Sequence, residues 1–297
     1  MRTWLGALAL DVALGEPPPA AHPVVLTGRA IGALERDAPL RPRPAMVRGA
    51  ILVFLPAAVA WSVGALAGRL RPALARTFAV TWLLKTAFAL RELDRAALRV
   101  ERDLRADRLD DARDDLRALV SRPTRDLDRA HVASAAIESV AENLCDSYVA
   151  PLFWYRLGGL PAALAYRVVN TADAMVGYRG RYEYLGKTAA RLDDALNWVP
   201  ARLAALAIAV AAPLVGAGTA ATLRAALPLA GRTASPNAGL PMAVAAVALG
   251  VRLEKPGHYL LGDGRESNAD DIARGRLLVL AAAGLVTAIA TLIAPRR

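Results

Sequence analysis

Long apolar runs alternate with short charged stretches along this chain of 297 residues. Three of the runs, residues 49–68, 203–223 and 277–295, contain no charged side chain. Each has the length at which a helix crosses the hydrocarbon core of a bilayer, about 20 residues. A fourth run, residues 77–90, is interrupted only by Lys85 and follows a tight turn, as expected of the return arm of a helical hairpin. The pattern predicts an all-α, polytopic integral membrane protein.

Two further apolar stretches contain helix breakers. Residues 148–169 include Pro151, Pro161 and a Gly-Gly pair, and residues 233–251 begin with a Ser-Pro-Asn sequence. Broken helices are tolerated at membrane depth only where protein or a water-filled cavity satisfies the backbone. We therefore expect re-entrant or half-buried segments that line a site.

Residues 91–129 are the opposite of a membrane span, because 11 Arg alternate with 11 Asp or Glu. This composition predicts a salt-bridged, solvated helical pair. The positive-inside rule places it in the cytoplasm together with residues 29–48. We expect a single membrane-embedded domain, residues 1–297, with a charged helical insertion at about 91–130.

Composition narrows the class of protein further. Hydrophobic residues make up 55% of the chain, and the single cysteine, Cys145, excludes a disulfide scaffold. The net charge of +10 raises the question of nucleic acid. However, the basic residues bracket apolar runs and form no Lys/Arg tract with interleaved aromatics, so no nucleic-acid partner is expected.

Three carboxylates recur every four residues in one predicted helix. Glu138, Glu142 and Asp146 share a helix face, with Ser134 one turn earlier. Like charges in such a stripe repel unless cations neutralise them. Oxygen ligands of this kind suit Mg²⁺ that is held jointly by protein and nucleotide phosphates. A solvated acidic face is the alternative.

A second polar cluster covers residues 170–200. Asn170 and Asp173 share a helix face, as do Asp193 and Asn197. Four cations lie between these pairs and could bind phosphates: Arg179, Arg181, Lys187 and Arg191. Snorkelling arginines and interfacial tyrosines are a structural alternative.

Two smaller clusters are also polar. Ser235 and Asn237 could cap a helix or bind an anion at its N-terminus, and Arg252 follows that helix. Near the N-terminus, Asp11 and His22 accompany a Gly-Glu-Pro sequence. The chain lacks a phosphate-binding P-loop, a Gly-x-Ser-x-Gly elbow, a His-Glu-x-x-His motif and a Cys/His metal set. We therefore expect chemistry by positioning of phosphates and metal.

Several long motifs resemble the CobD/CbiB family of cobalamin biosynthesis. The similarity covers nearly the whole chain and is weakest over residues 45–120. Its segments are residues 11–29, 137–146, 150–179, 190–202, 235–242 and 249–254.

This resemblance implies adenosylcobinamide-phosphate synthase, a multi-pass ligase of the bacterial inner membrane whose active site faces the cytoplasm. It would join (R)-1-aminopropan-2-ol O-phosphate to the f propionate carboxyl of adenosylcobyric acid. ATP and Mg²⁺ are the expected cofactors, and the lipid bilayer and other corrinoid-pathway enzymes are the expected partners. Amide formation requires an activated carboxylate, most simply an acyl phosphate, and such phosphoryl transfer depends on metal and cationic clamps.

Site residues follow from combining the clusters with this reaction. The metal ligands are expected to be Glu138, Glu142, Asp146 and Asp173. The catalytic carboxylates are expected to be Glu138, Glu142, Asp173 and Asp193. Residues expected to bind ATP or the amine phosphate are Arg122, Arg179, Arg181, Lys187, Arg252, Ser235 and Asn237.

Two other functions remain open, a transporter and a noncatalytic scaffold, and a third lacks its motif. A transporter would place polar residues midway along its spans, as Lys85 is placed. A CDP-alcohol phosphotransferase would show Asp-Gly-x-x-Ala-Arg, whereas Asp263-Gly264 is followed by a different sequence. A noncatalytic scaffold of a corrinoid-pathway complex would consume no ATP.

Overall fold

A computed structural model describes residues 3–20 and 22–293. It is almost entirely helical, as predicted, and it divides into two compact units. Unit 1 comprises residues 1–91 and 146–197, and unit 2 comprises residues 92–145 and 198–297. The chain therefore passes from one unit to the other more than once.

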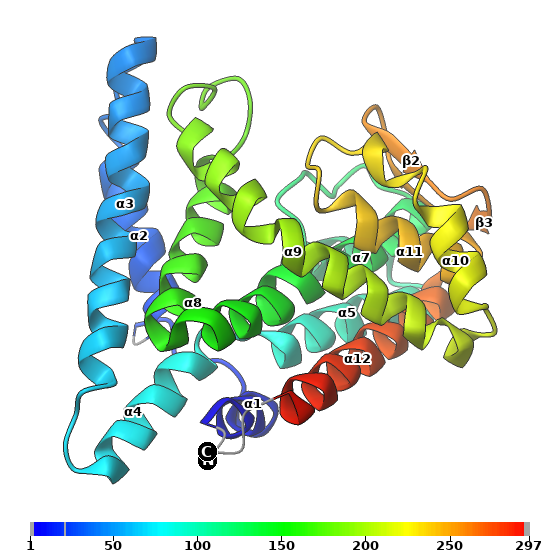
Figure 1. Ribbon diagram of the computed structural model, residues 1–297. Coiled ribbons are helices and arrows are strands. Elements are labelled where there is room, and N and C mark those ends of the chain that lie inside the picture. Colours follow the sequence, from blue (N-terminus) through cyan, green and yellow to red (C-terminus); the bar gives the residue numbers. More distant parts are fainter. Residues whose placement is uncertain (1–2, 21, 294–297) are drawn as a thin grey trace. The chain divides into compact units, whose positions relative to one another are not determined.

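The helices of unit 1 enclose an apolar cluster. These helices are α1 (Thr3–Leu14), α2 (Pro23–Glu35), α3 (Pro42–Ala67), α4 (Ala73–Lys85), α8 (Ala150–Val176) and the first part of α9 (Lys187–Ala211). The buried cluster consists of Ile31, Leu52, Val53, Val169, Ala172, Val176 and Ala189. Figure 1 shows α3 alongside α8, and the two helices are in contact.

Glycines let α3 approach its neighbours closely. A Cβ on Gly64 would lie 2.8 Å from the backbone of Pro161, and one on Gly49 would lie 2.0 Å from the carbonyl oxygen of Leu185. Small residues at such crossings are the usual means of packing membrane helices. The opposite side of α3 exposes large apolar side chains, among them Phe54 and Trp61. A bilayer would solvate that side.

Helix α8 is kinked where the sequence predicted a break. Gly159 has φ 69° and ψ −163°, a conformation that side chains disfavour, and Pro161 cannot donate a helical hydrogen bond. The predicted broken segment is therefore a bent helix.

Unit 2 is built around α7. Its helices are most of α5 (Leu90–Arg105), α6 (Leu109–Leu116), α7 (Arg129–Leu144), the end of α9, α10 (Thr219–Ala226), α11 (Gly239–Leu249) and α12 (Ala269–Leu292). The 3₁₀ segments η2 (Ala212–Val215) and η3 (Ala230–Arg232) also lie in unit 2, whereas the π segment η1 (Cys145–Val149) lies almost entirely in unit 1. Helices α6, α11 and α12 all contact α7, and most of its residues are buried.

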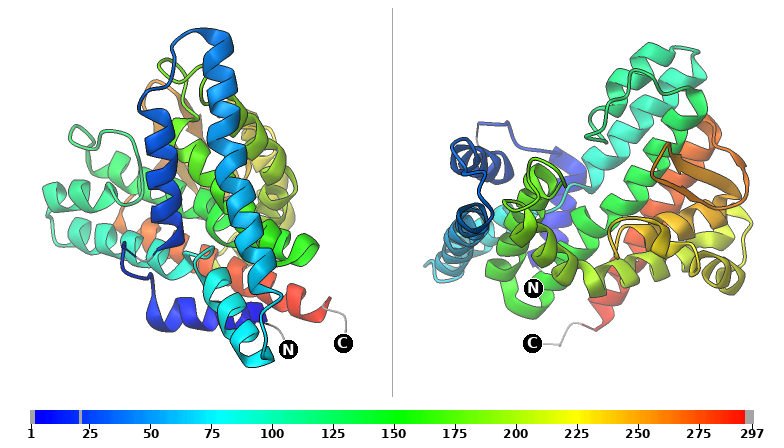
Figure 2. Two further views of the ribbon diagram at one scale, coloured as in Figure 1. Left: turned by 90° about the vertical axis from the view of Figure 1, so that its left-hand side faces the viewer. Right: turned by 90° about the horizontal axis from the view of Figure 1, so that it is seen from above.

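A small sheet in unit 2 was not predicted. Strands β1 (Val251–Lys255), β2 (Tyr259–Leu261) and β3 (Arg265–Glu266) form it in the order β2-β1-β3. Strand β1 pairs antiparallel with β2 and parallel with β3, and it also packs against α7 and α11. The short strands are visible in the right-hand view of Figure 2.

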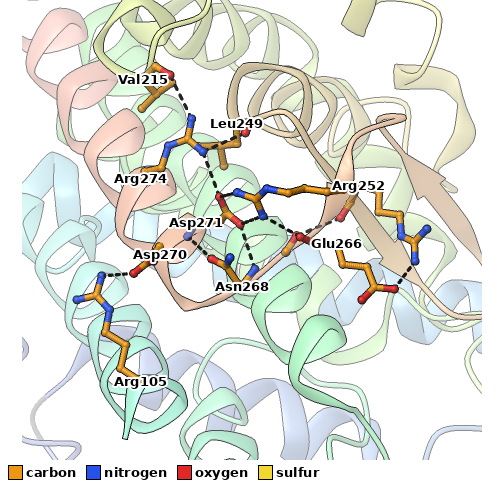
Figure 3. A network of polar contacts seen from close by, with 11 residues as sticks. Arg105, Val215, Leu249, Arg252, Glu266, Asn268, Asp270, Asp271 and Arg274 are labelled. Atoms are coloured by element: carbon orange, nitrogen blue, oxygen red, sulfur yellow. Dashed lines mark hydrogen bonds and ion pairs between the residues drawn. The ribbon is translucent and has the colours of Figure 1, made fainter. Parts of the chain in front are cut away.

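A buried ion network fixes the start of α12 (Figure 3). The Asp271 carboxylate is fully buried and accepts hydrogen bonds from Arg265 at 2.6 and 2.8 Å and from Arg274 at 3.1 Å. Asp271 and Asn268 also form a reciprocal capping box. Arg274 in addition donates to the carbonyl oxygens of Leu249 and Val215. These contacts join α12 to β3, α11 and η2.

Four helical stretches are long and apolar enough to cross a membrane: Pro42–Ala67, Ala73–Arg105, Lys187–Val215 and Ala269–Leu292. This agrees with the predicted polytopic helical protein. The run predicted at 203–223 is displaced, however, because Gly216 takes a left-handed conformation that ends the helix. The helix instead begins at Lys187, and Asp193 lies within it. The predicted residues 294 and 295 lie outside the described residues.

The charged segment forms the predicted helical pair, α5 and α6. Ion pairs join Arg99 to Glu92 at 3.3 Å and Arg105 to Glu101 at 2.8 Å. One side of α5 is apolar and buried, with Val100 and Leu104 at its centre. The cytoplasmic location of this pair stays a prediction.

Candidate functional site

The site begins with the local structure of α7. Asp128 caps the helix, because its carboxylate accepts the backbone N–H of His131 at 2.9 Å. This hydrogen bond also lowers the pKa of Asp128. Small residues then alternate with aliphatic ones along the helix, so it can be buried on nearly all sides. A charged side chain at its centre consequently needs partners from neighbouring elements.

Glu138 is that side chain, and its two carboxylate oxygens accept three hydrogen bonds. The hydroxyl of Ser134 donates to Oε1 at 2.7 Å. The hydroxyl of Tyr259, from β2, donates to Oε2 at 2.8 Å, and Nη2 of Arg122 donates to the same oxygen at 3.3 Å. The side chain of Glu138 is only 6% exposed. These partners neutralise and orient a buried carboxylate.

Tyr259 remains a donor over a wide pH range. Burial raises the pKa of its hydroxyl, and the neighbouring negative charge of Glu138 raises it further. Ser134 is fixed as well, since its hydroxyl accepts the backbone N–H of Glu254 at 2.7 Å. The carboxylate of Glu138 is therefore held between α7 and the small sheet.

Arg122 connects this network to a cavity of about 500 Å³. The cavity is lined by Arg117, Val120, Ser121, Arg122, Pro123, Thr124 and Arg125, which lie in the connection between α6 and α7. Nε of Arg122 is buried without a hydrogen-bond partner among the described residues. The predicted residue Arg122 thus lies between a buried carboxylate and a cationic cavity.

A second polar cluster lies within unit 1. Asn170 bridges two carboxylates, because its Nδ2 donates to Asp146 at 3.1 Å and to Asp193 at 3.3 Å. Asn197 donates to the other oxygen of Asp193 at 3.0 Å, as expected for residues on one helix face. Tyr166 in turn donates to Asn197 at 2.9 Å.

Arg167 supports the same cluster. It donates to the side chain of Asn170 at 2.9 Å and to the backbone carbonyl of Asp146 at 3.3 Å. The predicted residues Asp146 and Asp193 are therefore brought together, although they lie on different elements. Asp173 is on the same helix as Asn170 and is half-buried.

The predicted phosphate-binding cations of unit 1 do not form a cluster with these carboxylates. Arg181 pairs with Glu35 at 3.0 Å and stacks on Tyr182. Arg179 is exposed, and neither it nor Lys187 forms an ion pair within the part of the chain that the structure describes. Their roles in ATP binding stay predictions.

The remaining predicted residues make separate contacts within unit 2. The hydroxyl of Ser235 accepts the backbone N–H groups of Asn237 and Ala238 and so forms a local turn before α11. The side chain of Asn237 accepts a hydrogen bond from Arg202 at 3.0 Å. Arg252 pairs with Glu266 on β3. The predicted helix cap is wrong, because the N-cap of α11 is Ala238 and makes no side-chain cap hydrogen bond. Anion binding at this position stays a prediction.

The predicted metal ligands do not by themselves form a metal cage. Among residues 3–20 and 22–293, no three His, Cys, Asp or Glu side chains are grouped so that they could hold an ion. Both oxygens of Glu138 already accept hydrogen bonds. Magnesium usually binds through one or two carboxylates together with substrate phosphates. Of the predicted ligands, Glu138 and Glu142 lie in unit 2, and Asp146 and Asp173 lie in unit 1. Their roles as ligands of an ion that arrives with a phosphate stay predictions.

The N-terminal cluster surrounds Lys85. Its ammonium lies 3.0 Å from a carboxylate oxygen of Glu16 and 3.4 Å from one of Asp11. His22 contacts Glu16 at 2.6 Å and accepts the backbone N–H of Val24, which caps α2. Lys85 is therefore an ion-paired residue that joins α4 to the N-terminal segment.

Three residues of these clusters were not predicted as site residues. Tyr259 contacts Glu138 from 121 positions away, and no local spacing relates them. Tyr166 and Arg167 lie in residues 148–169, a stretch that contributed helix breakers and part of a family resemblance but no predicted site residue. Their spacing to Asn170, three or four residues, is the signal that could have identified them.

Comparison with known proteins gives one consistent result. The family profile described as CobD/Cbib protein matches residues 4–292. A cobalamin biosynthesis protein CobD of Dehalococcoides mccartyi is 45% identical over 88% of this chain and 86% of its own length.

Two other relatives cover still more of the chain. A probable cobalamin biosynthesis protein CobD of Thermococcus kodakarensis is 42% identical over 98% of this chain and 95% of its own length. A cobalamin biosynthesis protein CobD of Klebsiella pneumoniae is 39% identical over 96% of this chain and 95% of its own length. No solved structure matches.

Proposed function

Because the chain belongs to the CobD/CbiB family of cobalamin biosynthesis, we propose that it is an ATP-dependent amide-forming ligase. Its substrates are adenosylcobyric acid and (R)-1-aminopropan-2-ol O-phosphate, and its product is adenosylcobinamide phosphate. The protein acts in the bacterial inner membrane, with its site facing the cytoplasm. The arginine-rich segment of α5 and α6 supports this orientation.

The observation that carries the proposal is the position of Arg122. This side chain both lines the cationic cavity and donates to the buried carboxylate of Glu138. A guanidinium that is oriented by a fixed carboxylate is suited to bind phosphate oxygens. Amide formation from an ionised carboxylate and an ammonium group requires activation, which ATP supplies when it is bound.

The residues of this chain would contribute binding and orientation. Arg122 stabilises negative charge on a phosphate, and Glu142 is a candidate ligand for the Mg²⁺ that accompanies ATP. Asp193, in unit 1, is a candidate catalytic carboxylate, because the amine must lose a proton before it attacks. No serine or cysteine nucleophile is needed.

ADP release by the purified protein in nanodiscs tests this function. We expect release only when both the corrinoid acid and the amine phosphate are present, because the energy of ATP is coupled to the amide bond. A scaffold would release none, and an uncoupled ATPase would not depend on the two substrates. Either result would overturn the proposal.

Variants then test the carboxylates. Glu142→Gln should lower the rate by about 100-fold or more if Glu142 binds the metal, since charge stabilisation of the transition state typically contributes this much. Glu183→Gln, at an exposed position in unit 1, is the matched control and should retain the wild-type rate.

A further inference from the structure

Three arginines lie close together in the connection between α6 and α7. Arg117, Arg122 and Arg125 lie within nine residues, and all three line the cavity described above. Ser121 and Thr124 add two hydroxyl groups to its lining. The cavity is of the size that binds small molecules, since such sites typically measure about 300–1,000 Å³.

The positive charge of this cavity is only partly compensated. Arg117 lies 3.7 Å from Asp114, and its side chain is 68% exposed. Arg122 reaches Glu138 through one of its three nitrogens, while its Nε is buried without a hydrogen-bond partner among the described residues. Arg125 forms no ion pair within the part of the chain that the structure describes. A bound anion would satisfy the exposed donors of Arg117 and Arg125.

The segment that forms the cavity is fixed near both ends. The hydroxyl of Ser139, on α7, donates to the carbonyl oxygen of Leu119 at 2.8 Å. Nε of Arg113, on α6, donates to the carbonyl oxygen of Leu127 at 2.8 Å. The arginines therefore extend from a backbone that is already ordered, which reduces the entropic cost of binding.

The chemistry of the lining selects the kind of anion. Guanidinium groups and hydroxyls match the oxygens of a phosphate. None of the seven lining residues is aromatic, so the cavity offers no ring on which an adenine could stack. The lining therefore fits a small phosphate monoester better than a nucleotide.

We infer that the cavity lined by Arg117, Arg122 and Arg125 binds the phosphate group of a small, soluble phosphate monoester. This inference rests on the proposed function, in which the amine substrate is such a monoester. It assigns the amine phosphate to this cavity and leaves ATP to other residues. Glu138 is then a positioning residue, because it acts on the ligand through Arg122.

Direct binding tests the assignment without ATP or corrinoid. The full-length protein in phosphatidylcholine nanodiscs is titrated by calorimetry with O-phosphoethanolamine, a small amino-alcohol phosphate. The wild type should bind it, and Arg125→Gln should weaken binding by about 10-fold, as expected for the loss of one charged contact. Arg125 is exposed, so this variant should fold normally. Arg224→Gln, at an exposed arginine outside the cavity, is the control and should bind as the wild type does.

Four results would overturn the inference. The first three are an absence of binding by the wild type, unchanged binding by Arg125→Gln, and displacement of the probe by phosphatidic acid placed in the nanodisc. The third result would identify the cavity as a lipid headgroup site. The fourth is that ATP competes with the probe and that Arg125→Gln abolishes this competition. A nucleotide would then occupy the cavity, which contradicts the assignment.

The same variant separates this inference from the ligase proposal. In one outcome, ADP release does not depend on the substrates, but Arg125→Gln still weakens binding of the probe. The ligase proposal then fails, and the anion cavity is retained. If ligation is coupled as expected but Arg125→Gln keeps the wild-type KM for the amine phosphate, the cavity assignment fails alone. A rise in that KM of about 10-fold, with kcat nearly unchanged, supports the assignment.

Discussion

The two buried carboxylate clusters of this protein are stabilised in different ways. Glu138 in unit 2 accepts hydrogen bonds from a guanidinium and two hydroxyls, supplied by a loop, a helix and a strand. In unit 1, Asp146 and Asp193 are bridged by the amide of Asn170. A guanidinium cancels the charge of its partner, whereas an amide only solvates it.

The two clusters therefore differ in charge. A carboxylate that is neutralised by an arginine holds that arginine in place, which suits Glu138 to orient Arg122 toward a phosphate. In unit 1, two carboxylates share one neutral amide, and the guanidinium of Arg167 donates to that same amide. Removing charge should therefore have different consequences in the two clusters.

The largest effect is expected from Asp193→Asn. Both oxygens of Asp193 accept hydrogen bonds, one from Asn170 and one from Asn197. The NH₂ group of the new side chain would face one of these donors instead of accepting from it. Asn197 cannot turn its oxygen toward that NH₂ group, because this oxygen accepts a hydrogen bond from Tyr166. An unsatisfied buried donor costs about 1–3 kcal/mol, so thermal unfolding in detergent should shift to a clearly lower temperature. Asp37→Asn, at an exposed position, should leave it unchanged. An unaltered unfolding temperature in Asp193→Asn would mean that the bridging amide is unimportant.

Glu138→Gln should have a smaller effect on stability and a distinct effect on substrate binding. Glutamine keeps an oxygen for one of the donors, but it removes the charge opposite Arg122. Hydrogen bonds to charged groups contribute about 1.5–3 kcal/mol, and we expect part of this to be lost. The KM for the amine phosphate should rise more than that for ATP, in steady-state assays that vary each substrate. Equal changes in both values would contradict a role through Arg122.

Tyr259→Phe should be milder still. It removes one donor to Glu138, while Ser134 and Arg122 continue to contact that carboxylate. We expect a loss of about 1 kcal/mol in unfolding free energy, measured against wild type under the same detergent conditions. Ser134→Ala should cost more, because Ser134 also accepts the backbone N–H of Glu254. The reverse order of the two variants would show that the tyrosine is the principal partner.

The smallest effect is spectroscopic. Burial and the charge of Glu138 raise the pKa of Tyr259, so its hydroxyl should stay protonated at alkaline pH where exposed tyrosines ionise. In Glu138→Gln that pKa should fall, because the negative charge is gone. Ultraviolet titration, corrected with Tyr259→Phe in each background, measures the shift. A pKa of Tyr259 that is the same in both backgrounds would contradict the hydrogen bond.

The sequence predicted the membrane helices better than it predicted their limits. Charge-free runs identified α3 and α12, whose apolar length is sufficient evidence for a span. The absence of charged residues did not identify the first turns of α9, because these turns contain Asp193. That carboxylate is buried and accepts hydrogen bonds from Asn170 and Asn197. A charged residue can thus lie within a long apolar helix when it has partners within the protein.

The sequence predicted only part of the candidate site, because helical spacing relates residues that lie close together along the chain. Helical spacing grouped Asp193 with Asn197, a local relation that the structure confirms. It could not relate Glu138 to Tyr259, because that contact depends on how β2 packs beside α7. The sheet itself was missed because its strands are only two to five residues long, although β1 alternates apolar with charged residues as a half-buried strand does.

The central claim is that ATP activates the propionate carboxylate before the amine attacks it. Adenosylcobyric acid labelled with ¹⁸O in the f carboxylate tests this claim in nanodiscs that contain ATP and the amine phosphate. If the carboxylate attacks the terminal phosphorus, one labelled oxygen leaves with inorganic phosphate for each amide formed, and mass spectrometry will detect it there. Amide formation with unlabelled phosphate, or without consumption of ATP, would contradict the account.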